Sequence, residues 1–193
     1  MLTNPRLVLA MTLGALINGG TLAAFTFFAP VVTETAGLAE GWVSVALVMF
    51  GIGSFLGVTI AGRLSDRRPG LVLAVAGPLL LTGWIALASV ASHPVMLFVL
   101  LLVQGLLSFG VGSTVITGVL YAASGAPTLG GSYATAALNA GAAAGPVLGA
   151  LGLATGLGPS APIWIAAALT AGALVIMCLT RRVFMKPMAE AMG

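Results

Sequence analysis

Side chains capable of acid, base, nucleophilic or metal chemistry are scarce in this 193-residue sequence. It contains seven Lys and Arg, four Asp and Glu, one His and one Cys. His93 stands beside Pro94 in a short connection, and Cys178 lies in an apolar run, where a small buried hydrophobe is expected. One Cys and one His cannot build a multi-Cys metal site. We therefore expect no metal site and no bound cofactor.

The remaining polar groups within long apolar runs are amides and hydroxyls. Asn18, Gln104 and Asn139 are the amides, and Gln104 leads a small, polar stripe that includes Ser108. An amide in an apolar medium needs a partner, so each must face another helix or a wet cavity. Two interpretations stay open for Asn18, Gln104, Ser108 and Asn139, namely interhelical packing and the lining of a substrate cavity. We also expect a loosened, accessible backbone at Asn18-Gly19-Gly20-Thr21.

The elements that must position these groups are membrane helices. The sequence is 60% hydrophobic and 6% charged, whereas soluble proteins carry about 25% charged residues. No Asp, Glu, Lys or Arg occurs between Arg68 and Arg181. Although the pI is about 9.8, the few cations are scattered and do not form a surface for nucleic acid. The chain is predicted to be an integral membrane protein that contacts the lipid bilayer.

A helix needs about 20 apolar residues to cross the hydrocarbon core of a bilayer. The sequence accordingly predicts an all-α fold, a single domain over residues 1–193 with six transmembrane helices. Its length also permits a three-plus-three inverted repeat, which is half of a major facilitator fold. The predicted spans are residues 7–32, 42–64, 71–91, 95–120, 132–155 and 163–180.

The basic residues predict how the spans are oriented in the cell membrane. Lys and Arg concentrate on the cytoplasmic side of membrane proteins. With both termini in the cytoplasm, all seven Lys and Arg lie inside, whereas Glu34, Glu40 and His93 lie outside.

No ionisable side chain lies deep in any predicted span. Ion-coupled transporters usually keep such a residue, so this chain by itself lacks an obvious proton carrier. An intramembrane protease would need a Ser–His pair or two carboxylates within the membrane, and neither is present. We therefore expect that the chain is not an enzyme.

Two predicted spans carry small residues at a spacing of four. Such rows let helix backbones approach closely, and we interpret them as packing surfaces. They consist of Gly53, Gly57 and Ala61 on the second span, and of Gly141, Gly145, Pro146 and Gly149 on the fifth.

One connection carries a recognisable motif. Gly62-Arg63-Leu64-Ser65-Asp66-Arg67-Arg68-Pro69 resembles the loop signature of the major facilitator superfamily, G-x-L-x-D-R-x-G-R-R, although Pro69 and Gly70 replace part of its end. Asn4-Pro5-Arg6, with Ala29 to Glu34 and Ala36 to Leu38, resembles the entry to the seventh helix and the following loop of drug:proton antiporters. Phe50 to Gly57 resembles the eighth helix, and Asn139-Ala140-Gly141 with Gly145 and Gly149 resembles the eleventh. The resemblance covers nearly the whole chain.

This resemblance implies the C-terminal half of a chloramphenicol or multidrug exporter of actinobacterial type. Such a half would pair with a second six-helix unit, as a homo- or hetero-dimer, and export a small amphipathic molecule by proton antiport. Gly62, Arg63, Asp66, Arg67 and Arg68 would form its gating loop, with Asp66 latching onto a helix N-terminus of the partner. The alternative is a non-transporting fragment or relic of a split transporter gene, which neighbouring reading frames would distinguish.

Overall fold

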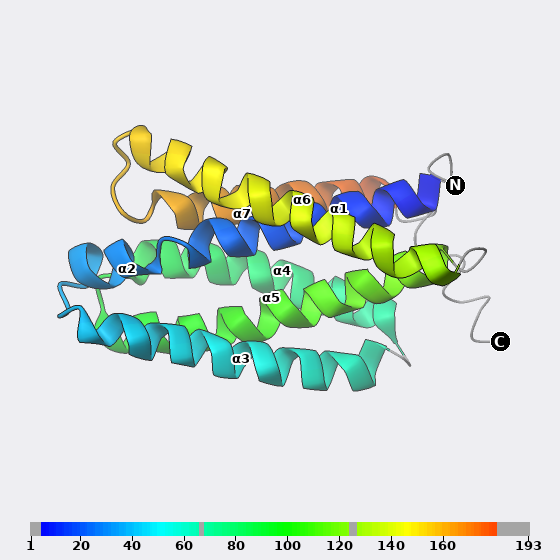
Figure 1. The fold of residues 1–193 in the computed structure, drawn as a ribbon. Helices are drawn as coiled ribbons and strands as arrows, with labels where there is room; N and C mark the ends of the chain where they lie inside the picture. The colour runs from blue at the N-terminus through cyan, green and yellow to red at the C-terminus, as the bar shows by residue number, and fades with distance from the viewer. Residues whose placement is uncertain (1–4, 66–67, 124–126, 181–193) are drawn as a thin grey trace.

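The computed structural model describes residues 5–65, 68–123 and 127–180, and nearly all of them are helical (Figure 1). Within these ranges, six helices are long and apolar enough to cross a membrane. A short helical turn and a π-helix follow the first of them. In chain order the elements are α1 (Pro5–Phe25), α2 (Phe28–Pro30), the π-helix η1 (Val31–Thr35), α3 (Gly41–Ser65), α4 (Pro69–Val90), α5 (Pro94–Ala122), α6 (Pro127–Ala154) and α7 (Ala161–Leu179).

The six predicted spans correspond to the six long helices, and the all-α membrane fold is confirmed. The first span is not one continuous helix as predicted, because regular α-helix ends at Phe25. Pro30 explains the break: it cannot donate a hydrogen bond, and its ring crowds the carbonyl four residues earlier, which belongs to Thr26. The fifth span also begins earlier than predicted, at Pro127, since Pro is well tolerated in the first helical turn.

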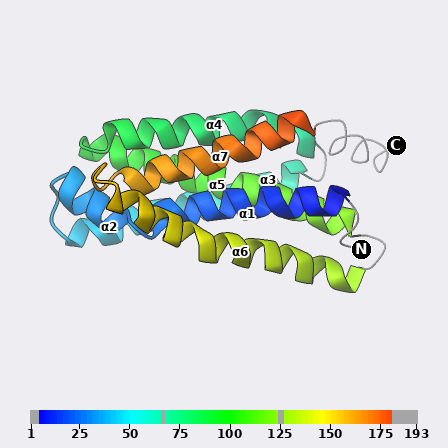
Figure 2. The same cartoon turned by 90° about the horizontal axis from the view of Figure 1, so that it is seen from above.

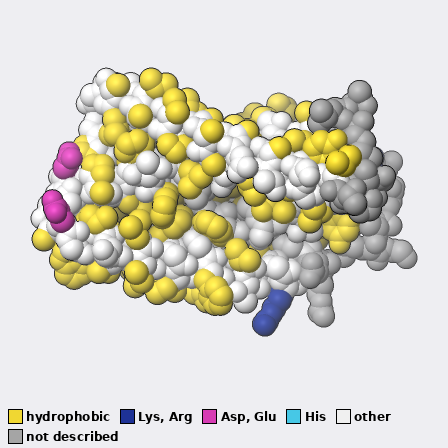
Figure 3. All heavy atoms as spheres, in the orientation of Figure 1, with side chains coloured by type: hydrophobic (Ala, Val, Ile, Leu, Met, Phe, Trp, Pro, Cys, Tyr) yellow, Lys and Arg dark blue, Asp and Glu magenta, His cyan; other side chains and the backbone are white. Residues whose placement is uncertain are grey.

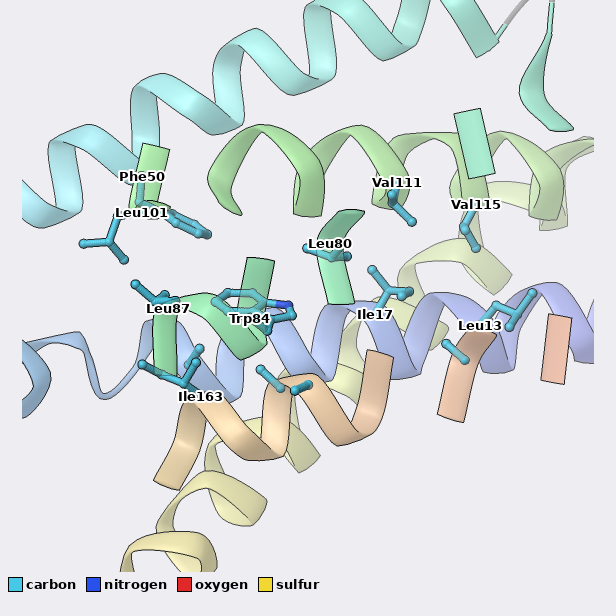
Figure 4. Packing of buried hydrophobic residues seen from close by; sticks show 14 of the residues in the cluster. Leu13, Ile17, Phe50, Leu80, Trp84, Leu87, Leu101, Val111, Val115 and Ile163 are labelled. Atoms are coloured by element: carbon cyan, nitrogen blue, oxygen red, sulfur yellow. The ribbon is translucent and has the colours of Figure 1, made fainter. Parts of the chain in front are cut away.

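The long helices lie in two rows. α6, α1, α5 and α3 pack side by side in that order, while α7 and α4 cover one side of this row and contact α1 and α5 (Figure 2). The centre of the bundle is apolar. Trp84 of α4 is fully buried there, and the side chains around it are Leu80, Leu87, Leu101 and Ile163 (Figure 4).

The tightest contacts repeat between the two halves of the chain. A Cβ added at Gly145 of α6 would overlap the carbonyl oxygen of Gly19 on α1, and one at Gly57 of α3 would overlap that of Leu106 on α5. One turn earlier, Gly141 faces Ala15 in the same way as Gly53 faces Leu102. The pair α1–α6 thus matches the pair α5–α3, which relates the first three long helices to the last three and supports the inverted repeat.

The two ends of the bundle differ in charge. α1 begins and α7 ends at the same end, where α3 also finishes with the exposed Arg63 and α4 starts after the exposed Arg68 (Figure 1). We call this the basic end. The exposed Glu34 and Glu40 lie at the opposite, acidic end (Figure 3).

Candidate functional site

Asn18 connects the first and fifth long helices. It is half-buried on α1, and its Nδ2 donates a hydrogen bond of 2.7 Å to the backbone carbonyl of Leu138 on α6. The expectation of a loosened, accessible backbone here is wrong, because residues 18–21 are regular α-helix and Gly19 and Gly20 are buried. A Cβ at Gly20 would lie 3.1 Å from the carbonyl oxygen of Ala166 on α7. The two glycines are therefore points of close helix contact.

Gln104 is enclosed between α5 and α4. Its exposure is 0%, and its Nε2 donates a hydrogen bond of 3.2 Å to the carbonyl of Leu80. The amide lies directly on Gly83, where a Cβ would overlap Oε1, and Oε1 itself has no hydrogen-bond partner. In this six-helix structure Gln104 is an interhelical group, which was one of the two interpretations left open.

The other two candidate polar residues, Ser108 and Asn139, differ in burial. Ser108 is 3% exposed, and its Oγ also has no hydrogen-bond partner. Asn139 is exposed on α6, one residue beyond the carbonyl that accepts from Asn18. The structure thus places Asn18 against Leu138, next to Asn139 in the middle of α6, while Gln104 and Ser108 stay inside the bundle and line no open surface.

A different face of α5 is open. Partly exposed side chains recur on it at helical spacing, a pattern that the sequence did not indicate because hydrophobic periodicity has little contrast in a helix this apolar. Phe109 is 41% exposed at its middle. We call this set the α5 stripe: Val99, Leu106, Phe109, Ser113, Ile116 and Leu120.

The ring of Phe109 is the open edge of an aromatic cluster. It packs edge-on against Phe50 of α3, with ring centroids 6.2 Å apart. Phe50 in turn lies 5.3 Å from both Phe25 and Phe28, which flank the break after α1. The pairs of Phe50 with Phe28 and with Phe109 are edge-to-face, and such pairs stabilise packing by about 0.5–1.5 kcal/mol each beyond area burial. The cluster therefore joins α1, α2, α3 and α5 and presents one ring to the open face.

The predicted gating loop is only partly described by the structure. Gly62 and Arg63 are exposed at the end of α3, and Arg68 is exposed before α4, whereas Asp66 and Arg67 lie outside the described residues. Next to the loop, the buried hydroxyls of Ser65 and Thr114 are 2.6 Å apart. Thr114 donates to the carbonyl of Gly110 at 2.9 Å, so Ser65 is the donor to Thr114. This pair, which the sequence did not indicate, fixes the end of α3 to α5.

The glycine rows lie at the helix contacts described above. Gly149 continues the row on α6, where a Cβ would lie 2.9 Å from the ring of Phe27 and 3.0 Å from the carbonyl oxygen of Ala23. Pro146 sits within α6, which continues through it.

Similarities to known proteins agree with this architecture. No protein-family model matches the chain. It is 64% identical over 175 residues to a chloramphenicol resistance protein of Streptomyces lividans, which covers 91% of this chain and 45% of that protein. It is also 29% identical to the uncharacterised MFS-type transporter YtbD of Bacillus subtilis, over 99% of this chain and 49% of the relative. The inner membrane transport protein YdhP of Escherichia coli is 27% identical over 94% of this chain and 47% of its own length.

The chain spans about half the length of the curated relatives it matches. Half of a transporter of this kind is a six-helix unit, and that is what the structure contains. Together, the helix architecture, the repeated contacts and these similarities identify the chain as a multi-pass membrane protein that resembles one half of the transporters of the major facilitator type that it matches.

Proposed function

We propose that this chain is the C-terminal half of an efflux transporter that exports a small amphipathic molecule, such as chloramphenicol, by proton antiport when paired with a first six-helix half. One observation carries the proposal, namely the 64% identity to a chloramphenicol resistance protein of which the chain spans 45%. The chain itself is not an enzyme under this proposal.

The row formed by α6, α1, α5 and α3 is the face that meets the other half. Its far side is covered by α4 and α7, which leaves one side of α1 and α5 without a covering helix among the described residues. The α5 stripe and Asn18 lie on these two central helices. An apolar surface with an aromatic ring and few polar groups suits a small amphipathic cargo. The cargo therefore binds between this face and the first half, against Phe109 and beside Asn18.

Proton coupling falls to the other half. The described parts of the six long helices contain only two charged residues, Arg6 and Arg63, and both lie at the basic end rather than within the bundle. A carboxylate that binds and releases protons must therefore come from the partner. The basic end faces the cytoplasm, following the positive-inside rule, so both termini are cytoplasmic.

Drug accumulation tests the proposal directly. The full chain is expressed in a chloramphenicol-sensitive host alone, with the first six spans of a chloramphenicol exporter, and with neither, and labelled chloramphenicol is measured inside the cells. We expect lowered accumulation only when both halves are present, and its loss when the proton gradient is dissipated.

A matched control separates export from expression. The first six spans are also expressed alone, and the membrane level of every chain is measured by immunoblot. If cells with every combination of chains accumulate as much chloramphenicol as cells with the empty vector, at equal chain levels, the result would contradict the proposal and favour a non-transporting fragment.

A further inference from the structure

Two tryptophans are exposed at the same level of the molecule. Trp42 opens α3 and is 47% exposed, and Trp164 lies in the first turn of α7 and is 44% exposed. Both helices begin at the acidic end of the bundle (Figure 1). The third tryptophan, Trp84, is 0% exposed in the core (Figure 4). The exposed indoles are thus confined to one end.

The opposite end carries the tyrosines instead. Both tyrosines of the sequence flank the connection between α5 and α6 at the basic end, and Tyr121 is 58% exposed. Tyr and Trp rings favour the interface between hydrocarbon and water, since one part of the ring is apolar and the other forms hydrogen bonds. The exposed Trp42 and Trp164 therefore mark one level of the bundle, and the exposed Tyr121 marks the other.

The distance between these levels fits a bilayer. Along α3, Trp42 and Arg63 are separated by roughly 31 Å of helix, given the rise of about 1.5 Å per residue. The hydrocarbon core of a membrane is about 30 Å thick. Between these two residues α3 exposes large apolar side chains, among them Val48 at 55%, Phe55 at 72% and Ile60 at 52%.

The indole N–H groups of Trp42 and Trp164 need an acceptor other than the described residues of this chain. Among the described residues, the indole N–H of neither Trp42 nor Trp164 has a hydrogen-bond acceptor, and the ring of Trp42 packs against the ring of Phe98, with centroids 5.5 Å apart. Ester carbonyl and phosphate oxygens of lipids supply such acceptors at the interface.

We infer that Trp42 and Trp164 form a lipid-binding surface that docks the acidic end of the bundle at the headgroup and glycerol layer of one leaflet. The two indoles lie on α3 and α7, which belong to different rows of the bundle, so together they fix both its depth and its tilt. This inference is independent of transport and of which leaflet is involved.

Depth-dependent fluorescence quenching tests the inference. The full chain is reconstituted in phosphatidylcholine vesicles whose lipids carry bromine either near the ester end of the acyl chains or near the chain terminus. Wild type is compared with Trp42→Phe, Trp164→Phe and the double variant, which retains only the buried Trp84 as an internal control. We expect shallow bromines to quench each exposed indole roughly twofold more strongly than deep ones, and Trp84 to be quenched least.

Each other outcome contradicts the assignment. Stronger quenching by deep bromines would place the indoles in the hydrocarbon core. Quenching of Trp42 or Trp164 no greater than that of Trp84 would show that protein, such as a second six-helix unit, covers that indole instead of lipid. Circular dichroism of each variant checks that the helices are retained. A Phe variant that has lost helix is replaced by Trp42→Tyr or Trp164→Tyr, and the quenching is measured again.

Discussion

Asn18 and Gln104 are both amides on central helices, yet their surroundings differ. Asn18 is half-buried and Gln104 is fully enclosed by α4. If the cargo lies against α1, Asn18→Ala in the paired transporter should reduce chloramphenicol efflux roughly two- to tenfold, the factor that corresponds to one lost hydrogen bond of about 0.5–1.5 kcal/mol.

Gln104→Met is the matched comparison. It removes an amide that has one weak hydrogen bond and one buried acceptor without a partner, and it retains most of the volume. Stability should change by less than about 1.5 kcal/mol, and efflux should stay near wild type. The measurement is drug accumulation at matched chain levels, and a larger loss from Gln104→Met than from Asn18→Ala would refute this division of roles.

Asp66 directly follows Ser65, whose hydroxyl bonds to Thr114 and so joins α3 to α5. The latch hypothesis predicts that Asp66→Asn lowers efflux by the paired transporter roughly two- to fivefold, because an exposed carboxylate at a helix N-terminus stabilises the closed state by about 0.3–1 kcal/mol. Membrane insertion and chain level should not change. Unaltered efflux at equal expression would leave Asp66 as a solvated charge.

At the scale of elements, the repeated glycine contacts give paired expectations. A Cβ at Gly57 or at Gly145 would overlap a backbone carbonyl of the neighbouring helix, so Gly57→Ala and Gly145→Ala must each push two helices apart. Each should destabilise the bundle by about 1–3 kcal/mol, and by similar amounts because the two positions are related by the repeat.

Gly51→Ala on α3 is the control for this pair. Nothing lies within 4 Å of a Cβ at Gly51, so the substitution should be neutral or should stabilise the helix by up to about 1 kcal/mol. Thermal unfolding in detergent, followed by circular dichroism, compares the three variants. Equal melting temperatures for Gly51→Ala and Gly57→Ala would contradict the close-contact assignment.

The helices themselves could be predicted from the sequence far better than their interior contacts. Long apolar runs define six spans regardless of packing, since hydrocarbon leaves the backbone no other partner. The break after Phe25 could also have been anticipated from Pro30. The direction in which Gln104 points could not, because hydrophobic periodicity has little contrast in a helix that is apolar on every side. The same weakness concealed the α5 stripe and the Ser65–Thr114 pair.

At the scale of the whole molecule, α3 and α6 leave faces open to lipid or to a second six-helix unit. These two helices are the least buried of the six, although both contain glycine-rich contact faces. We predict that the chain associates in membranes as a homo- or hetero-dimer. Single-molecule photobleaching of the labelled full chain in native lipid should reveal two copies per spot, or one copy together with a labelled first half; exclusively single, unpaired copies would count against it.

The bond from Asn18 to Leu138 has a consequence for how the bundle is made. Its donor and acceptor are 120 residues apart in the sequence. A ribosome adds about 5–20 residues per second, so roughly 10 s pass between synthesis of the amide and synthesis of its acceptor. Throughout that interval α1 is already made while Gly19 has no α6 to pack against. The Asn18 amide must therefore bond to water or to the insertion machinery until the fifth helix is made, and the contact between α1 and α6 cannot form before then.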